Sequence, residues 1–162
     1  MLNLTRFDLT NPSDWKDFIE IFDAYLHEVC TEDEYTEEIA CMHNTELNEQ
    51  LICQTLQNDN PYFVMRIDFN EQTIGLVSYS YHSIKQVGFI NNFYISPLFR
   101  NSGFGTAVCS LIEKHIISMG GKTIELSPID KAEQFYLRNG YTKHKETVDG
   151  EAIYHKTISQ DS

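Results

Sequence analysis

Arg100-Asn101-Ser102-Gly103-Phe104-Gly105 connects an apolar, strand-like run, Val87 to Ser96, to an amphipathic helical pattern from about Thr106 to Met119. A glycine-rich turn from a strand into a helix leaves backbone N–H groups unpaired at the positive end of the helix dipole. Gly103 and Gly105 carry no Cβ, so an anion can approach the backbone closely. The turn therefore predicts a site for phosphate oxygens, although the same residues could also form a tight strand-to-helix turn with no ligand.

Two further motifs flank this turn. Phe93-Tyr94-Ile95-Ser96-Pro97 precedes it, and Ala132-Glu133-Gln134-Phe135-Tyr136-Leu137-Arg138-Asn139-Gly140-Tyr141 follows it, after a helix and a strand. In this order and spacing, the three motifs resemble those of the GNAT superfamily of acyl-CoA-dependent N-acetyltransferases. The motif region runs from Val87 to Tyr141, about a third of the chain.

This resemblance implies acetyl-CoA, or a close acyl-CoA, as cosubstrate. The pyrophosphate would lie on the backbone amides from Asn101 to Thr106, and Arg100 would shape this loop and add positive charge. The backbone of Phe93, Tyr94 and Ile95 would hold the pantetheine arm and the thioester carbonyl, as an added strand is held by a sheet edge.

The resemblance also implies that Tyr136 is the acid that protonates the leaving thiolate, because a phenol can donate a hydrogen bond to sulfur. The alternative is that Tyr136 is a packed aromatic residue beside Phe135.

The general base is less clear, because Asn91 occupies the place where many members of the superfamily carry a carboxylate. Asparagine accepts no proton at neutral pH, so Asn91 or Asn92 would orient a water or the acceptor, or would only bond a neighbour in the strand. The other candidates are carboxylates and histidines, namely Glu28, Asp33, Glu34, Glu125, His27 and His82.

A second departure from the superfamily pattern lies between Leu126 and Ala132. Ser127, Pro128 and Asp130 occupy a link that lacks the asparagine of many relatives. We expect Asp130 to be the N-cap of the following helix.

The pattern of apolar residues predicts an α/β (α+β) fold, a mixed sheet of about seven strands flanked by about four helices. The order is strand, two helices, three strands, helix, strand, helix and two strands. Strands are expected at Asn3–Leu9, Tyr62–Phe69, Thr73–His82, Val87–Ser96, Thr123–Ser127, Tyr141–Lys145 and Ala152–Ile158. Helices are expected from Pro12 through the stripe Trp15, Phe18, Phe22, Leu26 and Val29, and at Tyr35–Gln57, Thr106–Met119 and Asp130–Arg138.

Several details refine this arrangement. Asn11 is expected to cap the first helix, and Ile39, Leu47 and Leu51 to be buried in the second. The strands from Tyr62 to Ser96 should form an antiparallel meander. The strand at 123–127 should lie parallel to Val87–Ser96, because a helix joins the two.

The chain has 162 residues, which predicts a single domain, 1–162. Its net charge of -12 argues against nucleic acid and anionic membranes as partners. Half of the 24 carboxylates lie between Asp14 and Glu49, where Lys16 is the only Lys or Arg. This run is either a solvated face or a negative field that attracts a cationic amine.

The cysteines and the N-terminus predict a cytoplasmic protein without metal. The four cysteines form no CxxC pair, and Cys41 and His43 lack a second ligand pair. No basic segment followed by an apolar run begins the chain, and no stretch has the length of a membrane span.

Three functions fit these observations to different degrees. The first is N-acetyl transfer from acetyl-CoA to a primary amine, small and cationic or on a peptide, by direct attack in a ternary complex. The second is an acyl-CoA-binding module with a regulatory role, supported by the missing carboxylate at Asn91. The third, a nucleotide-binding domain, is disfavoured because no GxxxxGKS loop is present. A homodimer through the C-terminal hairpin is a hypothesis by analogy with the superfamily.

Overall fold

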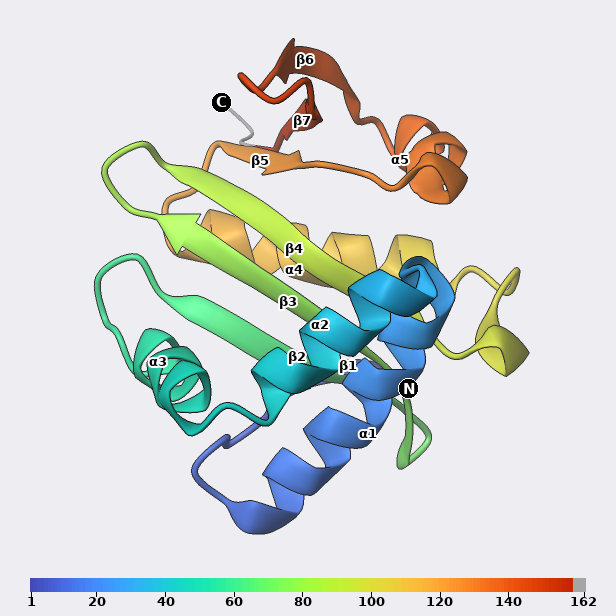
Figure 1. The fold of residues 1–162 in the computed structure, drawn as a ribbon. Helices are drawn as coiled ribbons and strands as arrows, with labels where there is room; N and C mark the ends of the chain where they lie inside the picture. The colour runs from blue at the N-terminus through green and yellow to red at the C-terminus, as the bar shows by residue number, and fades with distance from the viewer. Residues whose placement is uncertain (159–162) are drawn as a thin grey trace.

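The structure is a computed structural model and describes residues 1–158. Seven strands form one sheet in the spatial order β1-β2-β3-β4-β5-β7-β6 (Figure 1). Only β4 and β5 are parallel to each other, and the remaining neighbours are antiparallel. The strands are β1 (Leu2–Arg6), β2 (Tyr62–Phe69), β3 (Gln72–His82), β4 (Val87–Ile95), β5 (Thr123–Leu126), β6 (Thr142–Glu146) and β7 (Ala152–Thr157). The predicted mixed sheet, meander and parallel pair are confirmed.

Helices cover both faces of this sheet, with α1 and α2 on the near face of Figure 1 and α4 on the far face. The helices are α1 (Pro12–Val29), α2 (Glu32–Met42), α3 (Thr45–Thr55), α4 (Phe104–Ser118) and α5 (Glu133–Arg138). Residues 1–158 also contain two short 3-10 turns, Pro97–Phe99 and Asp130–Ala132.

The predicted helix Tyr35–Gln57 is wrong as a single element. It is divided into α2 and α3 at His43 and Asn44, and the Asn44 side chain accepts a hydrogen bond from the Leu47 N–H at 3.1 Å. That cap satisfies a free donor at the start of α3, so a new helix begins there. Leu47 is 42% exposed, and its predicted burial is also wrong.

The predicted start of α1 is confirmed, and that of α5 is not. The Asn11 side chain accepts from the N–H groups of Ser13 and Asp14 at 2.9 and 3.1 Å, with Pro12 at the first helical position. Asp130 makes no side-chain cap. It begins a 3-10 turn whose backbone passes into α5, so the helix is entered without the capping geometry that an N-cap aspartate needs.

Two apolar clusters hold the helices on the sheet. Phe18 of α1 packs with Val64 and Leu76 of the central strands. On the opposite face, Val108 and Ile112 of α4 are fully buried against the sheet. The strands therefore supply side chains to both clusters, as expected for a sheet covered by helices on both faces.

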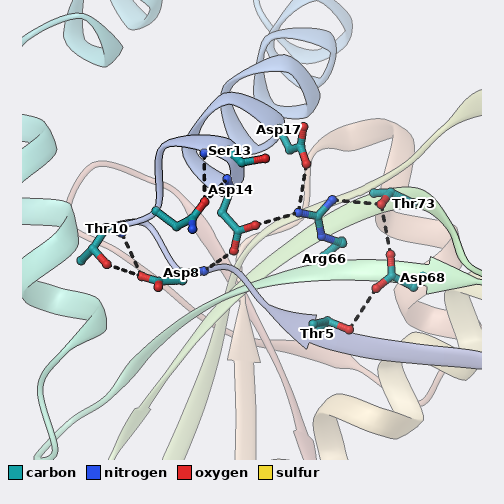
Figure 2. A network of polar contacts seen from close by, with 10 residues as sticks. Thr5, Asp8, Thr10, Ser13, Asp14, Asp17, Arg66, Asp68 and Thr73 are labelled. Atoms are coloured by element: carbon teal, nitrogen blue, oxygen red, sulfur yellow. Dashed lines mark hydrogen bonds and ion pairs between the residues drawn. The ribbon is translucent and has the colours of Figure 1, made fainter.

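A polar network joins the first turns of α1 to the sheet beside these clusters (Figure 2). Arg66 of β2 donates to Asp14 at 3.4 Å and to Asp17 at 3.2 Å, and to the Thr73 hydroxyl at 3.1 Å. Asp14 also accepts from the Asp8 backbone N–H at 2.7 Å. Two carboxylates of the acidic run therefore have structural partners.

Within residues 1–158, no helix combines the length and the apolar character that crossing a lipid bilayer requires. Over the same residues, no three His, Cys, Asp or Glu side chains gather so that they could hold a metal ion.

Candidate active site

The parallel pairing of β4 and β5 covers only part of β4. It runs from Val87 opposite Thr123 to Ile90 opposite Leu126, and then stops. Within residues 1–158, no strand therefore pairs with the segment from Asn91 to Ile95 on its β5 side. An unpaired strand edge presents N–H and C=O groups that an extended ligand can bond.

Asn91 lies where this open segment begins. Ile90 is opposite Tyr79 and Asn92 is opposite Ser78, so Asn91 is the extra residue of a β-bulge. Its side chain is exposed, and its amide donates a 3.5 Å hydrogen bond to the Phe89 carbonyl. A bulge bends the strand, and the bend coincides with the end of the β4–β5 pairing.

The backbone groups of the open segment point in alternate directions. The Tyr94 carbonyl faces β3, because a Cβ on Gly75 would lie 2.1 Å from its oxygen. The Ser96 N–H also bonds toward β3, to the Ile74 carbonyl at 2.7 Å. By the alternation of antiparallel strands, Phe93 and Ile95 direct their groups to the open edge. Tyr94 thus differs from the expectation, because its backbone faces β3.

The glycine turn lies at the end of this open segment. Gly103 is the N-terminal residue flanking α4, with a left-handed φ of 84°, and makes no side-chain cap. A Cβ on Gly103 would meet nothing within 4 Å, so the space in front of the turn is free. The first N–H groups of α4 therefore remain available at the positive end of a 15-residue helix.

Phe135 brings the three sequence motifs together. Its ring lies 6.0 Å from the Phe93 ring and 5.1 Å from the Tyr136 ring. A Cβ on Gly105 would lie 2.7 Å from a Phe135 ring carbon, so only glycine allows this contact. Gly105 therefore has a packing role, whereas Gly103 borders free space.

Tyr136 is buried on α5, with 6% of its surface exposed, and its ring packs at 5.6 Å against Tyr141. Burial raises the pKa of Tyr136, and the Cys109 and Tyr25 side chains raise it further. The phenol therefore stays protonated at neutral pH and can donate a hydrogen bond to a leaving sulfur, although the raised pKa makes complete proton transfer harder.

Arg100 is directed toward α1. Its guanidinium donates two hydrogen bonds to the Glu28 carboxylate, at 2.7 and 2.6 Å, and its Nε donates to the Ile95 carbonyl at 2.7 Å. The guanidinium also lies 5.5 Å from the centre of the Tyr94 ring. Hydrogen bonding to Glu28 raises the pKa of Arg100. Arg100 is bonded to the end of β4, and Glu28 balances its positive charge, which the sequence did not indicate.

Most of the candidate bases are engaged in other contacts. Glu28 is bonded to Arg100, and Glu34 forms a capping box with Thr31 that lowers the pKa of Glu34. Glu125 pairs with Lys145 at 3.6 Å, and His82 accepts from the Lys85 N–H at 3.2 Å. His27 lies 3.4 Å from Asp23 on the surface of α1. Asp33 is exposed in the first turn of α2.

Sequence reasoning overlooked two tyrosines and a serine near β4. Tyr25 lies 6.0 Å from Tyr94, ring to ring, and burial raises the pKa of Tyr25. Ser78 of β3 accepts a hydrogen bond from the Asn92 amide at 2.9 Å and is 2% exposed. Burial also raises the pKa of Tyr62, and hydrogen bonding to Ser78 and Asn92 opposes that shift. Only Tyr25 had a sequence signal, since it follows Phe22 by three residues on a helix.

Solved structures of several acetyltransferases share this architecture. The PaiA N-acetyltransferase of Thermoplasma acidophilum, solved in complex with coenzyme A, has a TM-score of 0.75 at 15% identity. The alignment covers 97% of this chain and 99% of that chain. Tetrahymena GCN5 has a TM-score of 0.70 at 12% identity, with 98% and 96% coverage. An aminoglycoside 6'-acetyltransferase type Ii has a TM-score of 0.68 at 18% identity, with 99% coverage of both chains.

At these identities the likeness concerns the fold alone. No curated protein matches the chain by sequence. The family model described as Acetyltransferase (GNAT) family matches residues 15–141, which is well over half of the chain. The chain therefore belongs to the acetyltransferase (GNAT) family.

Proposed function

We propose that the chain transfers an acetyl group from acetyl-CoA to a primary amine by direct attack in a ternary complex. The observation that carries this proposal is the meeting of three motifs at Phe135. Phe135 contacts Phe93 beside the open edge of β4 and Gly105 in the first turn of α4, and it is the chain neighbour of Tyr136.

The donor would bind along these elements. The backbone N–H groups of the turn, Asn101 to Thr106, would bond the pyrophosphate oxygens, and the free space at Gly103 leaves room for them. The pantetheine arm would pair with the outward backbone groups of Phe93 and with the Ile95 N–H, because the Ile95 carbonyl already accepts from Arg100. Arg100 would hold the end of β4 through the Ile95 carbonyl and contribute little net charge.

In the reaction, the amine nitrogen forms a bond to the thioester carbonyl carbon and the carbon–sulfur bond breaks. The departing sulfur takes a proton from the Tyr136 phenol, the amine loses a proton to water, and that proton returns through water to the Tyr136 phenolate, which restores the phenol. Asn91 would orient that water or the amine, since its side chain is exposed beside the open edge. Proximity would supply much of the rate, because the reacting groups are held together.

The charge of the chain gives a general indication of the acceptor. The net charge of -12 favours a cationic amine, small or on a peptide. Part of that charge has structural partners, because Asp14 and Asp17 pair with Arg66 and Glu28 pairs with Arg100.

A second candidate is an acyl-CoA-binding module with a regulatory role. Asn91 favours it, because the residue at the β-bulge cannot accept a proton. The two functions share the donor site and differ in turnover.

Released thiol from acetyl-CoA tests the proposal, measured with polyamines, amino sugars, amino acids, arylalkylamines and lysine peptides. Thiol release that depends on one amine class supports the enzyme. Stabilisation by CoA without thiol release on any amine favours the binding module. If CoA does not stabilise the chain and no amine gives thiol release, the assignment of the donor site is wrong.

A further inference from the structure

A cavity of about 130 Å³ lies between the helices on the α1 face and the strands below them. Its walls are mainly apolar and aromatic. They include Trp15, Phe18 and Phe22 from successive turns of α1 and Leu51 from α3. A cavity of about 150 Å³ with apolar walls holds one benzene molecule, so this cavity has room for a single ring.

Most of the polar side chains that line the cavity come from the strands, and Asn48 of α3 lines it from the helix side. Asn92 of β4 and Ser78 of β3 both line it and are joined by a 2.9 Å hydrogen bond. Tyr62 lines the cavity as well. None of the residues lining the cavity carries a charge at neutral pH. The cavity thus has an apolar end and an uncharged polar end.

The polar end coincides with the candidate reaction centre. Asn92 directly follows the β-bulge at Asn91 and belongs to the segment of β4 that β5 leaves unpaired. The floor of the cavity and the edge assigned to the donor are therefore parts of one short stretch of backbone.

We propose that this cavity binds the apolar group of the acceptor, and that the acceptor is an arylalkylamine with one ring. The inference rests on the proposed function. The ring lies among the aromatic side chains of α1 and Leu51, and the amine lies toward Asn92. Polyamines and amino sugars have no group of this shape and polarity, so they would leave the cavity unfilled.

This placement also accounts for an asparagine at position 91, where a carboxylate base would be expected. An ammonium group that leaves water for an uncharged site loses hydration and gains no counter-charge, so its neutral form is favoured. The neutral amine is the form that attacks the thioester. The cavity would therefore increase the reactive fraction without a general base at Asn91.

Two substitutions of Leu51 test the inference in opposite directions. Leu51→Phe fills the cavity and should raise the KM for phenethylamine by about 10- to 100-fold, the affinity equivalent of burying one aromatic side chain. Leu51→Ala enlarges it and should shift the preference toward a naphthyl amine. Gln54→Phe is the matched control, because it places the same side chain on the exposed face of α3. It should alter neither the KM for phenethylamine nor the preference between phenethylamine and the naphthyl amine.

Binding is measured separately from turnover. Phenethylamine titrated into the full chain without CoA should shift the NMR signals of the Asn92 and Ser78 side chains, and Leu51→Phe should abolish the shift. The inference is overturned if the chain acetylates polyamines as well as amines that carry a ring, and if neither Leu51 variant changes that turnover. This result leaves the proposed function intact. No thiol release with any amine overturns the proposed function itself.

Discussion

Tyr136→Phe removes the proposed acid and changes little else in the structure. The side chain is 6% exposed, and its ring is packed against Phe135 at 5.1 Å and Tyr141 at 5.6 Å, contacts that phenylalanine keeps. Proton transfer from a positioned side chain contributes about 10²- to 10⁴-fold to a rate. We therefore expect kcat to fall by about that factor, which corresponds to about 2.7–5.5 kcal/mol of activation free energy.

The neighbouring tyrosine supplies a matched control. The Tyr141 hydroxyl is buried and has no hydrogen-bond partner among residues 1–158. Tyr141→Phe removes a buried group that is not satisfied, so it should keep kcat and raise the free energy of unfolding by about 1–3 kcal/mol. The measurements are steady-state thiol release, the CoA dissociation constant by calorimetry, and urea unfolding of both variants.

The result that refutes this reasoning is specific. If Tyr136→Phe keeps kcat, Tyr136 is a packing residue. If Tyr136→Phe weakens CoA binding as much as it lowers kcat, the phenol acts in donor binding and the assigned acid role is wrong.

Three further predictions concern neighbouring groups. Asn91→Ala should lower kcat less than loss of the tyrosine acid does; a larger loss in the same thiol assay would assign the main proton-handling role to this residue. Glu28→Gln should break the bidentate pair with Arg100 and lower the free energy of unfolding by at most about 1 kcal/mol, because the pair is partly exposed. This cost should shrink in high salt in urea unfolding, and a cost that salt does not change would mean that packing holds α1 there. Burial lowers the pKa of His115, whose Nδ1 lies 2.6 Å from the Tyr79 hydroxyl, so the histidine stays neutral in the fold. The unfolded chain then binds the extra proton as pH falls below about 6.5, and stability is lost in that range. His115→Gln should flatten the decline in urea unfolding between about pH 7.5 and pH 5, and an unchanged slope would assign the decline to other groups.

Local sequence signals were sufficient for most of the fold. The glycine turn, the apolar run Val87–Ser96 and the helix after it were recognisable because each depends on residues close together in the chain. The start of α4 was placed two residues late, at Thr106. Gly103 flanks the helix with a left-handed φ, so Phe104 and Gly105 are already helical.

The break between α2 and α3 was not recognisable because no glycine or proline marks it. The segment Glu32–Thr55 is mostly polar, so its apolar pattern is weak, and a single asparagine at 44 restarts the helix. The position of β7 between β5 and β6 was also beyond local signals, because strand order depends on distant pairing.

Some residues of the candidate site could likewise be predicted from local motifs, and others depend on contacts between distant parts of the chain. The turn and Tyr136 followed from motifs, and the structure brings them together through Phe135. The Arg100–Glu28 pair joins residues 72 positions apart, and no local pattern indicates it. The ring-sized cavity arises from the way α1 and α3 rest on the sheet, which depends on packing between elements.

The central claim is that the turn at Gly103 binds acyl-CoA, and CoA titration calorimetry of two glycine variants tests it most directly. Gly103→Val and Gly150→Val introduce the same side chain at φ values of 84° and 85°, each where a Cβ would meet nothing within 4 Å. Both should carry similar backbone strain, about 1–2 kcal/mol, but only the first lies at the start of α4. The account predicts 1:1 CoA binding by the wild type and by Gly150→Val, and its loss in Gly103→Val. Equal CoA affinity in the two variants, or no binding by the wild type, would contradict it.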